Sequence, residues 1–584
     1  MDIFAIIKLL GGLAFFLYGM NVMSSGLERM AGGKLESILK RMTSNPFKSL
    51  LLGVGITAVI QSSSAMTVML VGLVNSGLMS INQSVGVIMG SNIGTTVTAW
   101  LLSLVGIEGD NILMNLIKPK NFSLLFAFIG ILMIMMSKRP KKKDVGTIMV
   151  GFAVLMFGME TMSGAVEPLT QNEGFQSILT AFNNPFLGVA FGAIFTAIIQ
   201  SSSASVGILQ AIAAHGGITY GMAIPIIMGQ NIGTCITAII SSIGVSRNAK
   251  KVSIVHISFN LIGTVVCLSV FYIANAVFDF AFTDTAISPF WIAIVHSIFN
   301  IATTLMLLPF TKVLVKIANF ILKDKPENEQ ADENTVFLDY RLLATPSIAI
   351  SECENATNKL ATLAKEALLL AIDTTKNYSE DKLNEVIRLE DITDQYEDKL
   401  GTYLVKISSK TLSDQDSKKV SKMLHAIGDF ERLGDHAVNI VKVAQELHEK
   451  KLKFSEQAQH ELTILIGALE EILELTTDAY NNNDVDTAKR VEPLEQVIDQ
   501  LVATIKVSHI QRLQAGNCSI EMGFILSDLL NNYSRVSDHC SNVAVAVIEI
   551  AHDTFDTHKY LNNVKYSSST FNDIYENFNA KYYL

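Results

Sequence analysis

QSSSA at residues 61–65 recurs without change at residues 200–204, 139 positions further along the chain. The same shift aligns NPF at 45–47 with 184–186, and GSNIGT at 90–95 with GQNIGT at 229–234. Of the 55 aligned positions from 45 to 99, 23 are identical, and the alignment needs no gap. Chance similarity between apolar segments matches Leu and Ile but not a polar tetrapeptide, so the chain contains an internal duplication.

Each QSSS motif lies between two short apolar arms. The arm Phe47–Ile60 has 14 residues and would reach about 21 Å as a helix, whereas a bilayer core measures about 30 Å. Arms of this length predict a re-entrant hairpin at 47–78 and a second at 186–217. A polar tip at membrane depth is tolerated only inside protein or beside a wet cavity.

Composition divides the chain into two unlike halves. Residues 1–320 hold 18 Lys or Arg and 11 Asp or Glu, whereas residues 321–584 hold 27 and 44. The first half has the low charge of a membrane protein, and the acidic second half argues against a nucleic-acid partner. Five cysteines without CxxC spacing indicate neither a disulfide framework nor a zinc site.

The first half contains apolar runs that predict seven membrane spans. They lie near 3–20, 84–106, 121–136, 146–162, 220–243, 252–275 and 287–311. We therefore expect an all-α protein with a polytopic membrane domain at 1–320, a linker at 321–335 and a cytoplasmic helical domain at 336–584. The two repeats would cover about 1–136 and 146–275, with 287–311 as a further span.

Basic loops orient the repeats. Residues 138–143 and 247–251 are rich in Lys and Arg, which places both loops in the cytoplasm. Three spans then separate the hairpins, so the repeats run in opposite senses, as in many secondary transporters. The prediction is a multi-pass protein of the cell membrane with its N-terminus outside and its second half in the cytoplasm.

The polar tips suit an anion and the neighbouring motifs suit a cation. Serine hydroxyls, backbone N–H groups and helix N-termini bind anions, and amide and hydroxyl oxygens suit sodium. We expect the two GxNIGT segments to be breaks that free backbone carbonyls. The predicted substrate ligands are Gln61, Ser62, Ser63, Ser64, Gln200, Ser201, Ser202 and Ser203. The predicted sodium ligands are Gln61, Asn92, Thr95, Gln200, Asn231 and Thr234.

Other interpretations stay open at this point. Ser and Thr in membrane helices commonly bond to neighbouring helices without binding a ligand. A protein that binds its ligand but signals instead of transporting it would carry the same motifs. An enzyme is not expected, because the sequence has no Walker, Rossmann or nucleophile motif.

The paired QSSS and G-[SA]-N-I-G-T motifs make residues 1–315 resemble the type II sodium/phosphate cotransporter family. The resemblance implies inorganic phosphate as substrate, held by the QSSS tips, and inward symport with sodium. The chain departs from the family pattern at Gln230.

The second half shows a helical period in six segments, near 352–376, 380–407, 416–448, 456–481, 484–514 and 520–553. It also contains an echo, since DFERLGDH at 429–436 parallels NYSRVSDH at 532–539. Carboxylates recur four residues apart on one helix face, which is unfavourable unless something compensates. Salt bridges to Arg388 and Arg432 or a hard metal cation would do so. The candidate metal ligands are Glu390, Asp394, Glu431, Asp435, Glu495, Asp499 and Asp538.

These repeats resemble the PhoU family of phosphate regulators, which has two three-helix bundles with E-x-x-x-D metal motifs. The resemblance implies a divalent or iron-type metal and a domain that restrains phosphate uptake. Ser534 stands where the fourth motif has an acid. A homodimer and a regulatory partner bound through this domain are both left open, and no role is assigned to residues 558–584.

Overall fold

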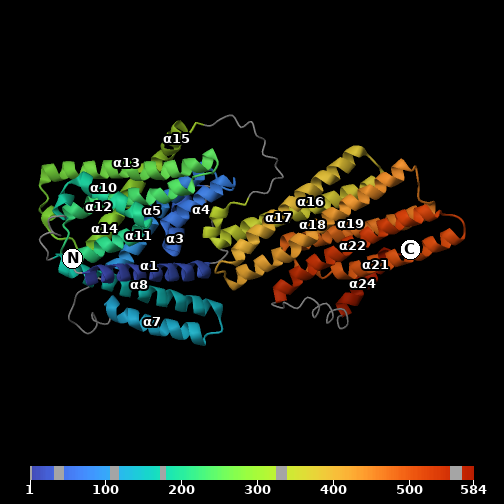
Figure 1. Cartoon of the computed structure of the whole chain (residues 1–584), viewed down its shortest axis with the longest axis horizontal. Coiled ribbons are helices and arrows are strands. Elements are labelled where there is room, and N and C mark those ends of the chain that lie inside the picture. The colour runs from blue at the N-terminus through green and yellow to red at the C-terminus, as the bar shows by residue number, and fades with distance from the viewer. Residues whose placement is uncertain (1–2, 32–44, 105–117, 171–178, 324–337, 553–568) are drawn as a thin grey trace. The chain divides into compact units, whose positions relative to one another are not determined.

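The computed structural model describes residues 3–31, 45–104, 118–170, 179–323, 338–552 and 569–584. These residues are almost entirely helical, as predicted (Figure 1). The chain divides into two compact units, one of Met1–Asn328 with Asp339–Ile348 and one of Glu329–Leu338 with Ala349–Leu584. Most of the predicted linker lies outside the described residues.

The first unit has six helical stretches that are long and apolar enough to cross a membrane, within the part of the chain that the structure describes. Their helices are α1 (Ile3–Ala31), α5 (Ile81–Ser103), α8 (Pro140–Thr170), α12 (Tyr220–Ser241), α13 (Arg247–Phe278), and α14 (Pro289–Leu307) with α15 (Thr311–Ile321). The predicted seventh span is α7 (Pro119–Met136), a shorter apolar helix that packs on α8.

Four further short helices form two helix–turn–helix elements around the QSSS motifs. They are α3 (Pro46–Ile60), α4 (Ser63–Asn75), α10 (Pro185–Ile199) and α11 (Ser202–Ala213). Asn45 and Asn184 cap α3 and α10 by accepting from backbone N–H groups, and a proline fills the first helical position of each. The duplicated NPF segment therefore starts both elements in the same way.

Glycines let the repeats pack backbone against backbone. A Cβ on Gly90 of α5 would lie 2.0 Å from the carbonyl oxygen of Leu50 in α3. The equivalent Cβ on Gly229 of α12 would lie 2.2 Å from the carbonyl oxygen of Val189 in α10. Helices α3 and α5, like α10 and α12, are thus held at a distance that only glycine permits.

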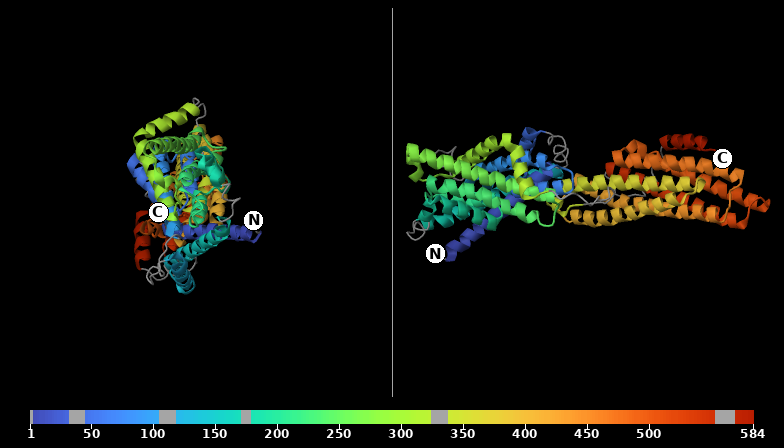
Figure 2. Two further views of the ribbon diagram at one scale, coloured as in Figure 1. Left: turned by 90° about the vertical axis from the view of Figure 1, so that its left-hand side faces the viewer. Right: turned by 90° about the horizontal axis from the view of Figure 1, so that it is seen from above.

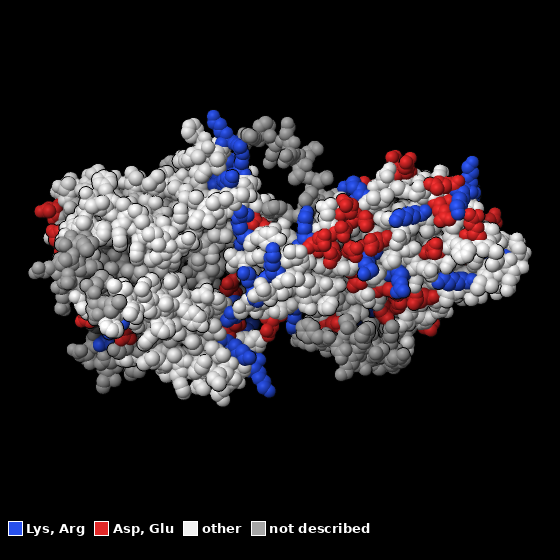
Figure 3. All heavy atoms as spheres, in the orientation of Figure 1, with Lys and Arg blue, Asp and Glu red and all other residues white. Residues whose placement is uncertain are grey.

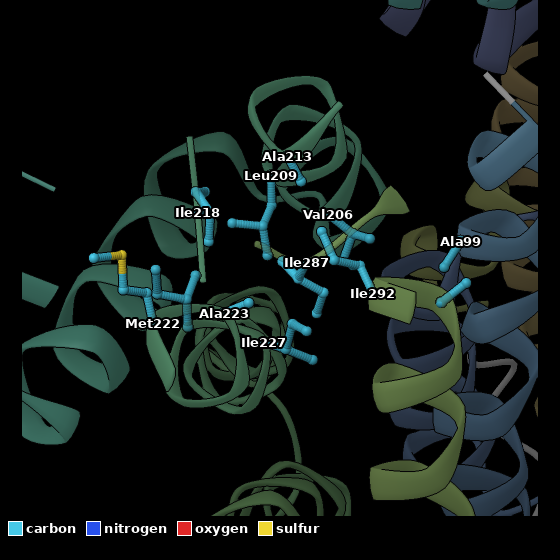
Figure 4. Packing of buried hydrophobic residues seen from close by; sticks show 12 residues of the cluster. Ala99, Val206, Leu209, Ala213, Ile218, Met222, Ala223, Ile227, Ile287 and Ile292 are labelled. Atoms are coloured by element: carbon cyan, nitrogen blue, oxygen red, sulfur yellow. The ribbon is translucent and has the colours of Figure 1, made fainter. Parts of the chain in front are cut away.

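Apolar side chains fill the interior of the second repeat. One buried cluster joins Val206 and Leu209 of α11 with Ala223 and Ile227 of α12, and α14 adds Ile292 (Figure 4). Clusters of this kind fix the second repeat around its polar tip.

The described part of the second unit contains six long helices, as predicted. Figure 2 shows them running side by side. They are α16 (Pro346–Lys376), α17 (Glu380–Ser408), α18 (Asp414–Glu449), α19 (Glu456–Asn482), α21 (Val491–Gln514) and α22 (Ile520–His552), with the short α20 (Val485–Ala488) before α21. Figure 3 shows many charged atoms on the visible face of this unit and few on that of the first.

The C-terminal tail adds a helix that the sequence did not reveal. Helix α24 (Ser569–Lys581) packs on α21, with Phe571 and Phe578 buried. Tyr575 donates a hydrogen bond to the side chain of Gln500, and Tyr582 donates to Glu471. Residues 558–568 of the tail lie outside the described residues.

A pair of glycine substitutions tests the close packing of α3 and α5. We expect Gly90→Ala to destabilise the protein by about 1–3 kcal/mol or more, because the new methyl group overlaps a backbone carbonyl. Gly55→Ala is the matched control, since no atom lies within 4 Å of a Cβ at that site. Melting temperatures of the purified protein in detergent give the comparison, and equal values for the two variants would contradict the packing argument.

Candidate functional site

Both helix–turn–helix elements turn on a glutamine in an unusual backbone conformation. Gln61 has φ 58° and ψ 21°, and Gln200 has φ 59° and ψ 22°. This left-handed region is unfavourable for residues with a Cβ, and residues held there cluster at functional sites. The duplicated sequence therefore produces the same strained turn twice.

The serine after each glutamine caps the second arm. Ser62 accepts a hydrogen bond from the N–H of Ala65 at 3.1 Å, and Ser201 accepts from the N–H of Ala204 at 3.2 Å. The other N–H groups of these first turns have no acceptor within their own helix, and the helix dipole adds partial positive charge there. Each tip is thus a weakly positive, hydroxyl-rich helix start.

The two tips differ in their surroundings although their sequences match. Gln61 is 6% exposed, and its Oε1 accepts a hydrogen bond of 2.7 Å from Thr98 of α5. Gln200 is exposed. Thr237, the counterpart of Thr98 in the second repeat, donates instead to the carbonyl oxygen of Thr234 in its own helix. The first tip is therefore buried and bonded to α5 of its own repeat (the closed tip), whereas the glutamine of the second tip is exposed (the open tip).

The predicted serine ligands are mostly enclosed. Ser63, Ser202 and Ser203 are buried, while Ser62, Ser64 and Ser201 are half-buried. No hydrogen bond between residues of the two tips is found in the described parts of the chain.

The second arms cross to the opposite repeat. Helix α4 packs on α12 and α13 of the second repeat, and α11 packs on α5 of the first. Gln210 of α11 donates hydrogen bonds of 3.0 Å to the carbonyl oxygens of Ala99 and Pro289. Each tip is therefore followed by a helix that contacts the GxNIGT helix of the other repeat, which couples the two repeats.

The GxNIGT segments are not helix breaks, contrary to the expectation from their glycines. Helices α5 and α12 run through them without interruption. Gly94 and Gly233 face Val54 and Ala193 of the short arms, so the glycines serve close packing. Freed backbone carbonyls are therefore not a source of sodium ligands at these positions.

The side chains predicted to bind sodium have hydrogen bonds of their own. Thr95 donates to the carbonyl oxygen of Ser91, and Thr234 donates to that of Gln230. The amide nitrogen of Asn92 donates to the carbonyl oxygen of Ile88 at 3.1 Å. The side-chain oxygen of Asn92 is therefore the atom that could bind a cation.

The corresponding Asn231 is bound differently. It donates to Oδ1 of Asn300 at 3.0 Å, and its own Oδ1 lies 3.3 Å from Nε2 of His296. Both partners come from α14, which has no counterpart in the first repeat.

The substitution at Gln230 changes the hydrogen bonding around the second tip. In the first repeat Thr57 donates to Ser91 at 2.9 Å, the position that Gln230 occupies in the second. Gln230 is buried, and Thr196 there donates to Ser205 of α11 at 2.8 Å. The departure from the family pattern thus has a local structural consequence.

Several residues of the site were missed at the sequence level. Thr98, Gln210 and Asn300 are buried polar residues that link the helices around the tips. Thr98 could have been found, because it is identical to Thr237 in the duplicated alignment. Nothing in the duplication marks Gln210, whose counterpart is Val71, or Asn300.

The second unit brings three predicted metal ligands together. Carboxylate oxygens of Glu495, Asp499 and Asp538 lie within 4.8 Å of one another. Ser534 donates a hydrogen bond of 2.9 Å to Asp499, so a hydroxyl occupies the place of the missing acid. Burial raises the pKa of Asp538, and the nearby Asp499 adds to this effect. This donor set fits a hard divalent cation.

The other four predicted metal ligands lie on α17 and α18. Burial raises the pKa of Glu390, with Asp435 and Asp394 as further causes. Burial also raises the pKa of Glu431 to about 6, again with a contribution from Asp435. Glu390 and Glu431 thus lie near further carboxylates, whose negative charge disfavours the ionised form of both groups. Arg388 forms a bidentate ion pair with Glu385.

The two halves of this unit contact each other through equivalent residues. Nδ1 of His436 lies 2.9 Å from Oδ1 of Asn532, and Nδ1 of His539 lies 2.8 Å from Oδ1 of Asp429. In the sequence echo, Asp429 corresponds to Asn532 and His436 to His539. The reciprocal pairs indicate a pseudo-two-fold relation between α18 and α22, which presents one acidic cluster on each side.

Comparison with known proteins agrees with this division. The Na+/Pi-cotransporter family matches residues 15–164 and 154–290, and the PhoU domain matches 357–444 and 462–547. The Salmonella typhimurium protein YjbB, whose name refers to inorganic phosphate export, is 23% identical over 551 residues, which cover 93% of this chain and 97% of YjbB. YqeW of Bacillus subtilis, an uncharacterized protein, is 30% identical over 314 residues, 54% of this chain and 97% of YqeW.

A shorter match involves a protein named for sodium-dependent transport. Sodium-dependent phosphate transport protein 2A of Rattus norvegicus is 38% identical over 100 residues, 17% of this chain and 16% of the rat protein. The duplicated tips, the apolar helices around them and these matches lead to one conclusion. The chain is a membrane protein that belongs to the Na+/Pi-cotransporter family and carries a PhoU domain.

Proposed function

We propose that the chain is a secondary transporter that imports inorganic phosphate together with sodium. The observation that carries this proposal is the pair of identical, strained glutamine turns, each of which opens a serine-capped helix. Family membership supports phosphate as the substrate, and the rat relative's name supports sodium. Import follows from an inward sodium gradient, whereas the name of YjbB refers to export, so direction needs its own measurement.

In this proposal phosphate is held by the tips. The serine hydroxyls and the N–H groups at the starts of α4 and α11 would donate hydrogen bonds to its oxygens. Sodium would supply the compensating positive charge, with Gln61, Asn92, Thr95, Gln200, Asn231 and Thr234 as the candidate ligands. The sodium ligands of the first repeat are the better supported ones, because the side chain of Asn231 in the second repeat already bonds to Asn300 and His296 of α14.

The difference between the tips supports a mechanism of alternating access. Gln61 is closed by its hydrogen bond to Thr98, while Gln200 is exposed. We propose that the two tips exchange their hydrogen bonding during transport. Thr237 would then leave the Thr234 carbonyl and donate to Gln200, while Thr98 would release Gln61. Because the repeats share their sequence here, the two arrangements would differ little in free energy.

The orientation of the protein is part of the proposal. Arg29 at the end of α1 forms an ion pair with Asp144 near the start of α8, so these ends lie together. Lys and Arg side chains of the first unit gather toward one end of its helices (Figure 3). We propose that this end faces the cytoplasm, which places the N-terminus outside and the PhoU domain inside.

We further propose that the PhoU domain restrains transport. Residues Asp339–Ile348, which lead into α16, belong to the first unit. The Asn75 side chain at the end of α4 donates to Asp339 at 2.7 Å, and Arg341 donates to the carbonyl oxygens of Ser241 and Ile243. A rearrangement of α16 would thus act on the end of a tip helix.

The deciding experiment is labelled-phosphate flux in proteoliposomes of the full chain, with inward, outward and no sodium gradient. Accumulation that follows an inward sodium gradient supports import, and efflux alone supports export. If phosphate binds without flux, the measurement is repeated with a chain that ends at Ile348. Flux that appears only then indicates a restrained transporter, and no flux in either protein overturns transport in favour of a membrane-bound sensor.

Substitution by glycine separates the glutamine side chains from their backbone strain. Gln61→Gly and Gln200→Gly each keep the left-handed turn, so we expect folding to be retained and phosphate transport to fall at least about tenfold. Asp279→Gly is the matched control, because Asp279 has φ 47° at the end of α13 and belongs to neither tip. Unchanged kinetics in both glutamine variants would remove these side chains from the site.

The acidic clusters predict metal-dependent stability. After chelation, Mn²⁺ at a hundred times its Kd should raise the stability of the full chain by about 2.7 kcal/mol, read from thermal melting. Asp538→Asn should weaken the binding, whereas Asp478→Asn, an exposed acid elsewhere in the unit, should not. Equal metal affinity in the two variants would contradict the site.

The metal-free protein should also respond to pH. Because the folded pKa of Glu431 lies above its ordinary value of 4.5, the folded state binds this proton more tightly. The stabilisation is fully present below pH 4.5 and is lost as the pH rises through about 6. After allowance for solvent screening we expect an effect of about 1 kcal/mol, which Glu431→Gln removes. A melting profile with the same pH dependence in that variant would contradict the assignment.

A further inference from the structure

A cavity in the second unit lies away from both acidic clusters. Its volume is about 750 Å³, within the range of small-molecule sites. It forms where the ends of α16 and α18 meet the first turns of α19 and the middle of α22. The cavity therefore draws on both halves of the PhoU domain.

The lining is basic although the unit as a whole is acidic. Lys376, Lys451, Lys453 and His448 line the cavity, and no Asp or Glu is among its described lining residues. None of the three lysines forms an ion pair with the part of the chain that the structure describes, unlike neighbouring Lys450, which pairs with Glu446 and Glu521. Three lysines in the wall of one cavity favour a ligand with several negative charges.

The walls add flat and apolar surfaces. The rings of Tyr378 and His448 stack with centroids 4.4 Å apart and an angle of 20° between their planes. Phe454 and several aliphatic side chains complete the lining. An aromatic face beside apolar walls suits a planar ring better than it suits an inorganic anion.

One residue of the cavity wall has a buried hydroxyl without a hydrogen bond of normal geometry. Tyr533 is fully buried and lines the cavity, and its Oη has no hydrogen bond of normal geometry to the described residues. The Thr375 hydroxyl, which donates to the carbonyl oxygen of Ile372, is a polar neighbour of this Oη without a hydrogen bond of normal geometry to it. Buried polar groups nearly always have a partner, so an unmet hydroxyl here indicates a place for a ligand atom.

Lys451 occupies a position that favours glycine. It has φ 54° directly after α18, and the N–H of Leu452 bonds to the carbonyl oxygen of Leu447 at 2.9 Å. The end of α21 has the same bonding pattern with Gly516 in that position. A lysine in place of the usual glycine costs stability, and such a cost is typical of functional sites.

We infer that this cavity binds a nucleotide. The three lysines engage its phosphates, the base stacks beside Tyr378, and the Tyr533 hydroxyl bonds to an atom at the bottom of the cavity. Inorganic phosphate alone would leave the aromatic and apolar walls without a contact. The inference does not depend on the direction of transport or on sodium coupling, because binding is measured without flux.

Titration of ATP and AMP into the full chain in detergent, by calorimetry and with a fluorescent ATP analogue, tests this inference. Saturable binding is expected. The double variant Lys376→Gln/Lys453→Gln should weaken it at least about tenfold. Lys489→Gln, which alters an exposed lysine that does not line the cavity, should leave the Kd unchanged.

Two further variants separate binding from folding. Tyr533→Phe keeps the ring, so it should weaken nucleotide binding several-fold without lowering the melting temperature. Lys451→Gly should raise the melting temperature and weaken binding, and a purely structural lysine would not give these opposite effects. Absence of saturable binding, an unchanged Kd in the double-lysine variant, or inorganic phosphate binding as tightly as ATP would each overturn the proposal.

Discussion

Backbone contact through glycine is the constraint on which the first unit depends. Gly90 against Leu50 and Gly229 against Val189 bring each short arm so close to its long helix that no side chain fits between them. The short arms end at Gln61 and Gln200, so this contact fixes where each polar turn lies. Without it, a turn that carries unpaired N–H groups would have to find other partners in an apolar environment, at considerable cost.

The same turn sequence lies in two different environments, and a helix outside the repeats adds to the asymmetry. Helix α14 follows the duplication and supplies His296 and Asn300 to Asn231. The first repeat has no such helix, and its Asn92 bonds within α5. Local strain is therefore symmetric, whereas the closure of Gln61 and the exposure of Gln200 reflect tertiary contacts. A scaffold with two nearly equivalent arrangements has the property that alternating access requires.

Sequence alone predicted much of this fold because its signals are local. The duplication revealed the tips, apolar runs revealed the long helices, and the period of the second half revealed its six helices. The glycines of GxNIGT were misinterpreted as breaks, since a glycine that packs against a neighbouring helix has the same sequence as one that interrupts its own. Helix α24 has few apolar residues, and its stability comes from burying Phe571 and Phe578 against the bundle.

Sites that combine distant segments lie beyond such predictions. The acidic clusters could be found because each carboxylate pair repeats at i, i+4 on one helix, although their approach to one another could not. The basic cavity leaves no trace in the sequence, since Lys376, Lys453 and Tyr533 belong to three separate segments. The PhoU domain thus presents carboxylates suited to a cation and ammonium groups suited to an anion in one bundle. If each ligand stabilises the folded form to which it binds, both would act on the same helices, α18 and α22, whose reciprocal His436 and His539 contacts connect the two halves.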